Sequence, residues 1–595
     1  MRLPELNPLN TQSLMTQNFR GLDTRPRAGA GAFCAMENMQ GDPAPLIATR
    51  QRRGLVTTLQ NPQGLLSAGA LAWIDGSTLY YGGKATAITD LSLAEDMLPK
   101  QMVAMGAYIV IFPDGAYYNT ADPTDHGRID RLWQRGENQS VTYQLCQMDG
   151  TVYPDSSITV ADVEPASPAD GALWIDTSGD PHLLKKWVET LGLWQGVGSV
   201  YVKIGCAGIG AGLSVQDGVQ LSGIALTDEG ATDEQKRQYK ALNTTMIITA
   251  RGDDYIVVTG IIDKSSTQTT GTVRADRKMP RMQHVCECNN RLWGCFKGTR
   301  DGQQLNEIYA CALGDFKNWR KYMGTSQDSY AVSVGTDGEF TGAITHMSRP
   351  YFFKAGCVHK LYGEKPSNFE MQYTECDGVR PGCGATLKGV NGTLYYLSLN
   401  GVEAFETLPV DVSQQLGQEK FDAAAAGEYD GKYYISMRGK SGDWALYCYD
   451  TTQEKWHRED GTHAIAFARL GDELYMLCAD GRLFAINGTT GTLEAPLHWR
   501  ADSAMLGYEY KDHKYLSRFN IRMKLGQWAT CTLYIEYDSS GIWEPKGHMK
   551  GQAQVKTYTL PVVPRRCDHL RLRLEGDGEA QIYSIARILE IGSDN

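Results

Sequence analysis

The sequence predicts an all-β protein: a β-propeller with one or more small β-barrel or sandwich modules inserted into it, and a C-terminal β-sandwich. Short aromatic or β-branched runs alternate with turns that contain Gly or Asp, which is typical of antiparallel hairpins. Pairs of such hairpins recur about every 40 residues, the length of a four-stranded propeller blade. Because the spacing is not perfectly regular, a stack of β-sandwiches stays open as an alternative.

The chain has 595 residues, more than one hydrophobic core usually organises, so several structural units are expected. We place the boundaries of these units where the spacing of the predicted hairpins changes. In order, we expect an N-terminal arm with the first propeller strands (1–55), a first part of the propeller (56–135), inserted β-rich modules (136–275), a second part of the propeller (276–496) and the C-terminal β-sandwich (497–595).

The clearest propeller hairpins lie at residues 71–81 and 108–118, where two aromatic runs flank an Asp-Gly turn. In the second part of the propeller, residues 431–435 are expected to pair with residues 444–449. Residues 449–456 resemble kelch-type blades, in which an Asp-led turn is followed by a Trp packed between blades. These segments predict the most regular part of the propeller.

The propeller rhythm is lost between residues 136 and 275, which begin with strand patterns around a Pro- and Gly-rich linker at 165–171. Residues 232–242 predict a short helix, because Thr232 and Gln235 stand at capping-box spacing. The apolar runs 245–249 and 254–262 predict a hairpin around Arg251-Gly252-Asp253. This tripeptide matches an integrin-type motif, but the hairpin needs Gly and Asp for its turn.

From about residue 497 the repeat stops, and residues 515–595 predict a separate sandwich. The strands expected at 519–524, 531–537 and 569–574 alternate apolar with polar side chains. Such alternation is typical of sheets with one packed face and one solvated face.

The net charge of −11 and the pI of about 5.6 argue against a general nucleic-acid binder, since phosphate binding needs clustered Lys and Arg. The basic cluster that stands out is Arg50-Gln51-Arg52-Arg53. The fourteen cysteines include no Cys-x-x-Cys, and the closest pair, Cys286 and Cys288, is followed by Cys295 without a zinc-finger set. We therefore expect buried, reduced thiols.

The N-terminal residues carry no apolar signal region, and the longest apolar stretch, 103–112, is interrupted by Gly106. This pattern predicts no membrane span and synthesis and assembly in a cytoplasm.

No motif in the sequence supplies the residues of a reaction centre. The glycine-rich segment 206–212 is not followed by Lys-Ser or Lys-Thr, which argues against a phosphate loop. The sequence has no Gly-x-Ser-x-Gly elbow, which would supply a serine nucleophile that one of the eleven histidines could activate. We therefore expect a structural protein and not an enzyme, with no catalytic residues, no cofactor and no metal site.

Three segments near the N-terminus, 18–25, 35–39 and 45–54, resemble the opening of tailed-bacteriophage tail proteins. Residues 168–176 resemble a sequence segment common in phage virion proteins, and the C-terminal segments 564–569 and 575–578 agree with this pattern. The family that the chain resembles is the tail nozzle or hub of short-tailed phages, a virion structural protein in which a propeller with inserted β-domains forms a ring.

The resemblance implies a homo-oligomer, usually a hexamer, that continues the DNA-ejection channel. Its partners would be copies of itself, head-tail adaptor or portal proteins, and tail fibres or tip proteins. Viral DNA would pass through without sequence-specific binding, and an acidic lining lets a polyanion slide. The protein would reside in the virion tail after assembly in the cytoplasm of the host bacterium.

Two alternatives stay open. The chain is a receptor-binding or baseplate protein whose sandwich at 515–595 recognises host surface glycans through exposed Trp and Tyr side chains. Or it is a propeller glycosidase, since sialidase-like propellers carry Asp-containing turns and an arginine cluster. Residues 449–456 match such turns only in part, lack their central Gly, and no arginine cluster can be nominated.

Overall fold

The computed structural model describes residues 10–42, 44–88, 91, 99–300, 302–507, 514–563 and 565–591. The regular secondary structure of these residues is almost entirely β-strands, with a single α-helix and short 3-10 helices among them. The chain divides into two compact units. Unit 1 comprises Met1–Met102, Asp337–Lys360 and Tyr373–Asn595, and unit 2 comprises Val103–Thr336 and Leu361–Gln372. No helix in the described part of the chain is long and apolar enough to cross a membrane.

The repeating element of the fold is a four-stranded antiparallel sheet in which each strand pairs with the next along the chain. Such a sheet is a propeller blade. Four of these sheets are β7 (Pro62–Ser67), β8 (Leu71–Asp75), β9 (Thr78–Tyr81) and β10 (Lys84–Ala87); β31 (Phe340–His346), β32 (Arg349–Lys354), β33 (Cys357–Tyr362) and β34 (Glu370–Glu375); β35 (Lys388–Val390), β36 (Thr393–Leu397), β37 (Val402–Phe405) and β38 (Pro409–Asp411); and β39 (Phe421–Tyr429), β40 (Lys432–Gly439), β41 (Trp444–Asp450) and β42 (Lys455–Arg458).

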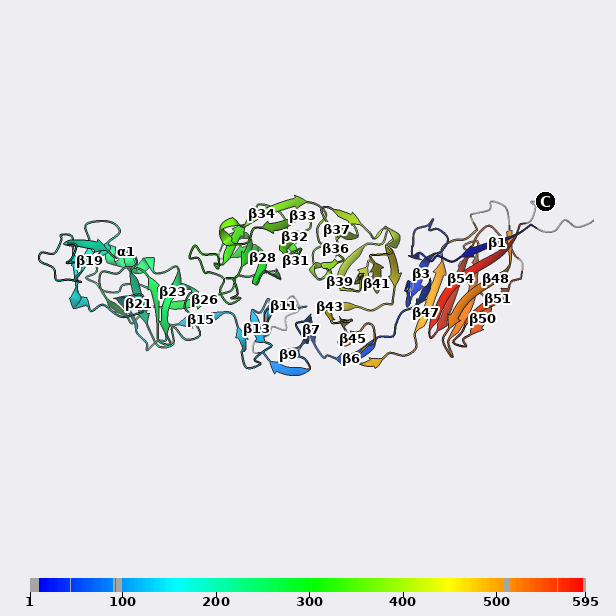
Figure 1. The fold of residues 1–595 in the computed structure, drawn as a ribbon, viewed down its shortest axis with the longest axis horizontal. Helices are drawn as coiled ribbons and strands as arrows, with labels where there is room; N and C mark the ends of the chain where they lie inside the picture. The colour runs from blue at the N-terminus through cyan, green and yellow to red at the C-terminus, as the bar shows by residue number, and fades with distance from the viewer. Residues whose placement is uncertain are drawn as a thin grey trace, which may run out of the picture. The chain divides into compact units, whose positions relative to one another are not determined.

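A further blade of unit 1 combines strands from opposite ends of the chain. Strands β43 (Ala464–Leu470), β44 (Glu473–Cys478) and β45 (Arg482–Ala485) are followed by β6 (Gly54–Thr58), which pairs antiparallel with β45 and with β46 (Thr492–Leu493). Figure 1 shows β6 beside β45. The first strands β35, β39, β43 and β7 pack side by side in this order. This radial succession is the β-propeller that the sequence predicts.

Trp456 on β42 is fully buried, and its indole N–H donates to the carbonyl of Val412, which follows β38 of the preceding blade, at 2.7 Å. The turn before it is led by Asp450, whose Oδ1 accepts the backbone N–H groups of Thr452 and Gln453 at 2.9 Å each. The expected arrangement of an Asp-led turn and a Trp between blades is therefore confirmed.

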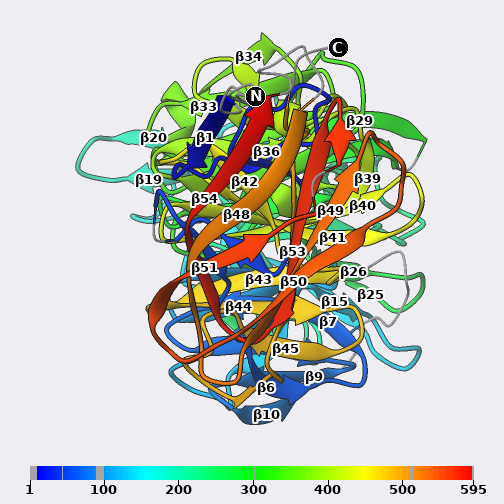
Figure 2. The same ribbon diagram turned by 90° about the vertical axis from the view of Figure 1, so that its right-hand side faces the viewer.

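The C-terminal sandwich is built from both ends of the chain (Figure 2). One sheet has the order β4-β5-β54-β48-β51, with β1 on β54 and β52 on β48; the other, β2-β3-β47-β53-β49-β50, continues blade β39–β42 into a ten-stranded sheet. The strands are β1 (Asn10–Thr16), β2 (Gly21–Leu22), β3 (Ala32–Glu37), β4 (Met39–Gln40), β5 (Ile47–Thr49), β47 (His498–Ser503), β48 (Lys514–Leu525), β49 (Thr530–Tyr537), β50 (Glu544–Lys550), β51 (Val555–Pro561), β52 (Arg566–Cys567), β53 (Leu570–Asp577) and β54 (Ala580–Ile591).

The predicted alternation is present in the sandwich: on β53, Leu570, Leu572 and Leu574 are buried while Arg571 and Arg573 lie between them, partly exposed. The N-terminal residues do more than open the propeller. Because β1 and β5 pair with β54, and β3 with β47, the sandwich includes strands from before residue 50.

Unit 2 contains an inserted module between two further blades. The blades are β11 (Gln101–Met105), β12 (Tyr108–Phe112), β13 (Ala116–Asn119) and β14 (His126–Arg128), and β27 (His284–Cys288), β28 (Arg291–Arg300), β29 (Gln303–Ala310) and β30 (Tyr330–Ser333). The module contains β15 (Arg131–Gln134), β16 (Val141–Cys146), β17 (Ile158–Ala161), β18 (Leu173–Asp176), β19 (Leu183–Val188), β20 (Leu193–Gly196), β21 (Tyr201–Gly205), β22 (Gly218–Ser222), α1 (Asp233–Ala241), β23 (Thr245–Gly252), β24 (Tyr255–Thr259), β25 (Ser266–Gln268) and β26 (Arg274–Arg277).

Two local predictions in the module are confirmed. Helix α1 starts with a capping box: Thr232 Oγ1 accepts the backbone N–H of Gln235 at 3.2 Å, and the Gln235 side chain accepts the N–H of Thr232 at 3.0 Å. Strands β23 and β24 form the expected hairpin, with Gly252 opposite Tyr255. Arg251-Gly252-Asp253 therefore lies at a hairpin turn, where Arg251 also pairs with Asp253.

Candidate functional site

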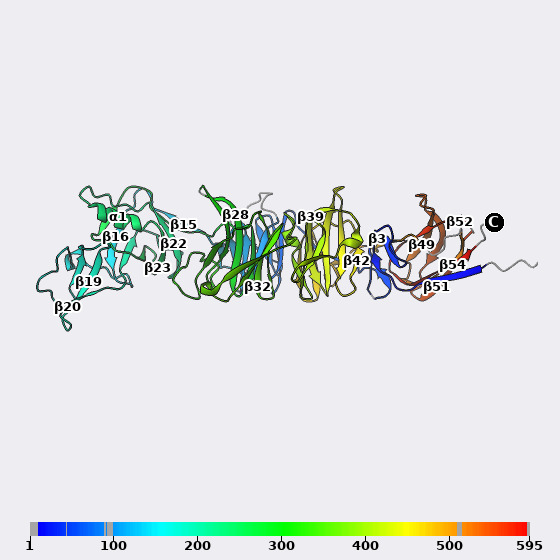
Figure 3. The same cartoon turned by 90° about the horizontal axis from the view of Figure 1, so that it is seen from above.

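The N-terminal segment from residue 18 to residue 53, here called the clasp, joins blade β39–β42 to the sandwich (Figure 3). Within it, β2 pairs with β42, and β3 pairs with β47. Gly21 on β2 has a φ of +74°, and a Cβ there would lie 2.4 Å from the carbonyl oxygen of Trp456. Only glycine permits this close approach of the clasp to the blade.

A buried ion cluster holds the end of the clasp. Arg53, 2% exposed, donates to Glu459 Oε2 at 2.5 Å and to Asp460 Oδ2 at 2.8 Å, while Arg50 pairs with Glu494 and lies 3.4 Å from Asp460 Oδ2. Burial opposes the charge on Arg53, but the two carboxylates outweigh it and raise the pKa of the guanidinium. Burial also opposes ionisation of Asp460, yet Arg53 and Arg50 lower its pKa to about 2.

Further donors of the basic cluster are also used inside the protein. Arg50 Nε donates to Asn38 Oδ1 at 2.8 Å, and Asn38 Nδ2 donates to the carbonyl of His498 on β47 at 2.8 Å. Arg52 Nε donates to the carbonyl of Glu494 at 2.6 Å. The sequence Arg50-Gln51-Arg52-Arg53 therefore binds carboxylates and carbonyls of its own chain and is no phosphate-binding patch.

A polar cavity of about 250 Å³ lies beside the clasp, between residues of the clasp and of blades β39–β42 and β43–β45. Its cation Lys432 is paired with Asp42, and burial raises the pKa of its Tyr434 phenol. Asn487 Nδ2 has no hydrogen-bond partner among the described residues. Since the cavity's arginine, Arg50, is also paired, the cavity offers no free cation for an anionic ligand.

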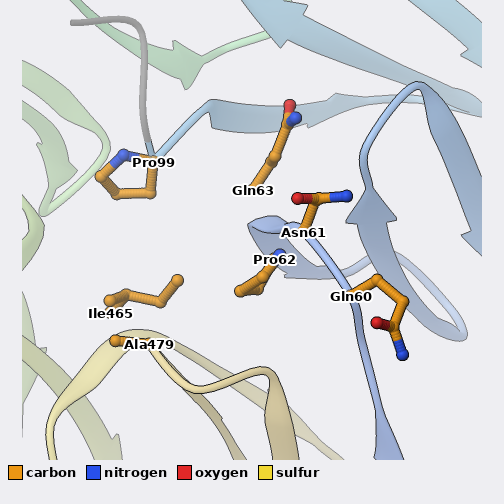
Figure 4. A pocket seen from close by; sticks show the side chains of 7 residues that line it. All are labelled: Gln60, Asn61, Pro62, Gln63, Pro99, Ile465 and Ala479. Atoms are coloured by element: carbon orange, nitrogen blue, oxygen red, sulfur yellow. The ribbon is translucent and has the colours of Figure 1, made fainter. Parts of the chain in front are cut away.

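A second cavity, of about 410 Å³, opens where the β6–β7 connection meets blade β43–β45 (Figure 4). The described residues that line it have amide or apolar side chains. It will be called the proline cavity, after Pro62 and Pro99; the other lining residues are Gln60, Asn61, Gln63, Ile465 and Ala479.

A carboxyl pair on blade β35–β38 is the arrangement closest to acid–base chemistry. Glu403, 3% exposed, lies directly opposite Asp411 in the β37–β38 register, and Ser398 Oγ donates to Glu403 Oε1 at 3.0 Å. Burial raises the pKa of Glu403; the Ser398 hydrogen bond opposes this, and the charges of Asp411 and Asp377 add to it. A carboxyl group with a raised pKa beside a second carboxyl group is a feature of general acid catalysis.

Other sequence candidates have structural roles. Within the glycine-rich segment, Gly208 N–H donates to Asp254 Oδ1 at 2.7 Å and Gly210 N–H donates to the carbonyl of Asp253 at 2.9 Å, so these amides are occupied. Twelve of the fourteen cysteines are buried, as expected, and Cys34 and Cys376 are partly exposed. His182 Nδ1 lies 2.9 Å from Asp263 Oδ2, and Gln238 Nε2 donates to Asp263 Oδ1 at 2.8 Å, so this pair is held by an amide side chain.

The aromatic residues expected on the sandwich differ in exposure. Trp528 is 87% exposed, whereas the Trp543 ring is covered by the guanidinium groups of Arg573, at 4.0 Å from the ring centre, and Arg571, at 5.5 Å. Tyr537 is buried. A glycan-binding surface of several aromatic rings is therefore not assembled from these three side chains.

The chain is similar in fold to solved structures of low sequence identity. One is an exo-β-1,3-galactanase from Phanerochaete chrysosporium, with 9% identity over 51% of this chain and 95% of that one and a TM-score of 0.21. Another is a glycoside hydrolase family 43 arabinoxylan arabinofuranohydrolase from Bacillus subtilis, with 9% identity over 52% and 95% and a TM-score of 0.17. No protein-family model and no curated protein matches the sequence.

These matches correct one expectation from the sequence. The chain was expected not to be an enzyme, yet the solved structures that it matches include glycoside hydrolases, and this expectation is corrected. The names describe those proteins, and at these identities and TM-scores they assign no reaction to this chain. The sequence missed Glu403 because its pairing with Asp411 depends on strand register, although both positions lie in a recognisable hairpin.

Proposed function

We propose that the chain is a structural subunit of a bacteriophage tail, forming a nozzle or hub ring that is part of the DNA-ejection channel. The ring would link the head-tail connector to distal tail parts. The segments 18–25, 35–39 and 45–54, which resemble phage tail proteins, are the starting point of this proposal.

The observation that carries the proposal is the location of those segments. They form the clasp, in which Gly21 contacts blade β39–β42 and Arg50 and Arg53 bind Glu459 and Asp460. The resemblance therefore falls on residues that join the propeller to the sandwich, and similarity at such positions favours a shared architecture. It is not confined to exposed residues that vary freely.

The charge balance supports passage of DNA. The net charge is −11, and the basic cluster of the clasp is buried and paired. A ring of such subunits, six in the usual assembly, would repel phosphates weakly along its channel and bind no particular sequence. Its partners would be its own copies, an adaptor or portal protein, and fibres or tip proteins, in a virion assembled in the bacterial cytoplasm.

The test is the composition of purified particles. Mass spectrometry of particles banded on a density gradient should find the chain at several copies per particle, and antibodies against it should label the tail in electron micrographs. A chain that is absent from the particles, while known capsid proteins are detected, would overturn the proposal.

A propeller glycosidase is the second candidate, and the pair Glu403–Asp411 favours it. Glycoside hydrolysis uses two carboxyl groups, one of which acts as a general acid and has a raised pKa, and Glu403 has a raised pKa and lies opposite Asp411. The expected result is hydrolysis of a polysaccharide in a substrate screen, reduced at least about 100-fold by Glu403→Gln. Glu406→Gln, at an exposed position on the same blade, is the matched control. Hydrolysis that survives Glu403→Gln, or no hydrolysis of any substrate, would reject this candidate.

A further inference from the structure

Trp528 combines two unfavourable features on the surface of the sandwich. Its side chain is 87% exposed, and its backbone φ is +71°, a left-handed conformation that bulky residues rarely adopt. A strained backbone of this kind persists where the surroundings enforce it. Packing against the described residues explains neither feature, so the indole is a candidate for contact with another molecule.

The turn that carries Trp528 is braced by neighbouring turns. Gly526 N–H donates to the carbonyl of Glu579 at 2.8 Å, and Gly551 N–H donates to the carbonyl of Ala529 at 2.8 Å. Ala553 N–H donates to the carbonyl of Leu525 at 3.0 Å. Because the turn is already ordered, little conformational entropy remains to be lost when the indole binds.

The proline cavity has the size and lining for an aromatic ring. Its volume is about 410 Å³, and a cavity of about 150 Å³ suffices for benzene. In Figure 4 the Pro62 ring and the Ile465 side chain face the space between the elements, with Pro99 and Ala479 at its border. These apolar groups would contact the faces of a planar ring.

The cavity also contains an acceptor for a single N–H donor. In Figure 4 the amide oxygen of Asn61 is turned toward the space between the elements, whereas the amide of Gln63 points away from it. An indole N–H can donate to such an amide oxygen. Among the described residues the lining has no charged side chain, which fits a neutral aromatic occupant.

We propose that Trp528 of one copy of the chain inserts into the proline cavity of a neighbouring copy. The knob and the cavity are different surfaces, so the contact is heterologous, and repetition of it generates a ring when the rotation closes. This inference rests on the proposed function, since it names the contact by which the ring subunits bind one another. Tryptophan is enriched among the residues that dominate such interfaces.

Cross-linking between variants that each carry one introduced cysteine, in a chain whose partly exposed Cys34 and Cys376 are replaced by serine, tests the contact directly. Trp528→Cys and Ala479→Cys proteins are mixed and treated with a short bismaleimide, and a dimer containing one chain of each is expected. Val563→Cys mixed with Ala479→Cys is the matched control, because Val563 is an 81% exposed residue of the same sandwich. A cross-link no stronger than that control would overturn the inference.

Assembly measurements provide the second test. In sedimentation experiments, Trp528→Gly is expected to raise the dissociation constant between copies about thirtyfold, the size of an interface hot spot. Ala479→Trp, which fills the cavity mouth, should have a similar effect, and the double variant should be no worse than either. Val563→Ser should leave assembly unchanged. Equal assembly of the Trp528→Gly and wild-type proteins would contradict the proposed contact.

The two proposals fail separately. If the chain is found in particles but position 528 does not cross-link to position 479, the contact is wrong and the tail assignment stands. If the cross-link forms but the chain is absent from particles, the copies associate through this contact and the tail assignment is wrong. Protection of Trp528 by a glycan or by another virion protein, with no cross-link between copies, also overturns the contact.

Discussion

The clasp and the Trp528 turn belong to the same unit, and they differ in whether a side chain in a costly environment has a partner within the chain. In the clasp, Arg50 and Arg53 are buried, and each is paired with carboxylates of blade β39–β42 or of the segment after β46. At the turn, an apolar ring is held in solvent on a strained backbone. We infer from this difference that the clasp contacts are completed within one chain, whereas the Trp528 side chain needs a partner molecule.

The energetic consequences differ in the same way. A buried charge that loses its partner has no water to replace it, so the clasp should respond strongly to substitution. An exposed ring loses nothing in the isolated chain when it is removed. Stability should therefore depend on the clasp, and association of copies should depend on the turn.

The largest expected effect is that of Arg53→Met, which leaves Glu459 and Asp460 without their closest cation. We expect a loss of about 3–5 kcal/mol in the free energy of unfolding, measured by urea denaturation. The matched control is Arg438→Met, because the ion pair of Arg438 with Asp422 is about half exposed and screened by solvent, so its loss should change stability little. Similar losses in the two variants would contradict the distinction.

Gly21→Ala tests whether the clasp must approach the blade closely. The new Cβ would lie 2.4 Å from the Trp456 carbonyl oxygen at a φ of +74°. Gly83→Ala shares the positive φ, +81°, but meets nothing within 4 Å. Thermal unfolding should show Gly21→Ala to be about 2 kcal/mol less stable than Gly83→Ala, since only the former adds a steric clash. Equal stabilities of the two variants would mean that the clasp does not approach the blade closely at Gly21.

The pH dependence of stability sharpens the assignment of charges in the clasp. The pKa of Asp460 is lowered to about 2 from 3.8, so its ionised form stabilises the fold fully above pH 4, and this contribution is lost as the pH falls through 2. Between pH 5 and pH 2, the stability advantage of the wild-type protein over Asp460→Asn should shrink by about 2 kcal/mol. Parallel pH profiles would show that Asp460 is not the titrating group.

The smallest expected effect on stability is that of Trp528→Gly. Glycine adopts the φ of +71° without strain, and this gain offsets the greater freedom of glycine in the unfolded chain. The free energy of unfolding of the monomer should change by less than about 1 kcal/mol, as urea denaturation of dilute protein will report. A loss of several kcal/mol would mean that the indole stabilises the isolated chain.

Features with local causes were predictable from the sequence. The capping box of Thr232 and Gln235, the β23–β24 hairpin and the Asp450 turn each involve residues a few positions apart, and each is present as expected. The alternation on β53 likewise predicted a sheet with one packed face, because burial follows the period of the strand.

Features that join distant parts of the chain were not predictable. Arg53 and Glu459 are separated by 406 residues, and nothing in a basic run indicates which carboxylate lies opposite once the propeller closes. The pairing of β6 with β45 and the lining of the proline cavity also bring together residues that are far apart in the sequence. The raised pKa of Glu403 depends on burial and on strand register, so the sequence alone did not nominate it.

The most direct test of the tail assignment is an averaged electron-microscopic image of purified particles in which the chain carries a small added domain at its C-terminus. Additional density is expected as a ring of equivalent points around the tail axis, with the symmetry of the subunit ring. Particles whose images do not change, although the tagged chain is expressed, would show that the protein is not part of the tail.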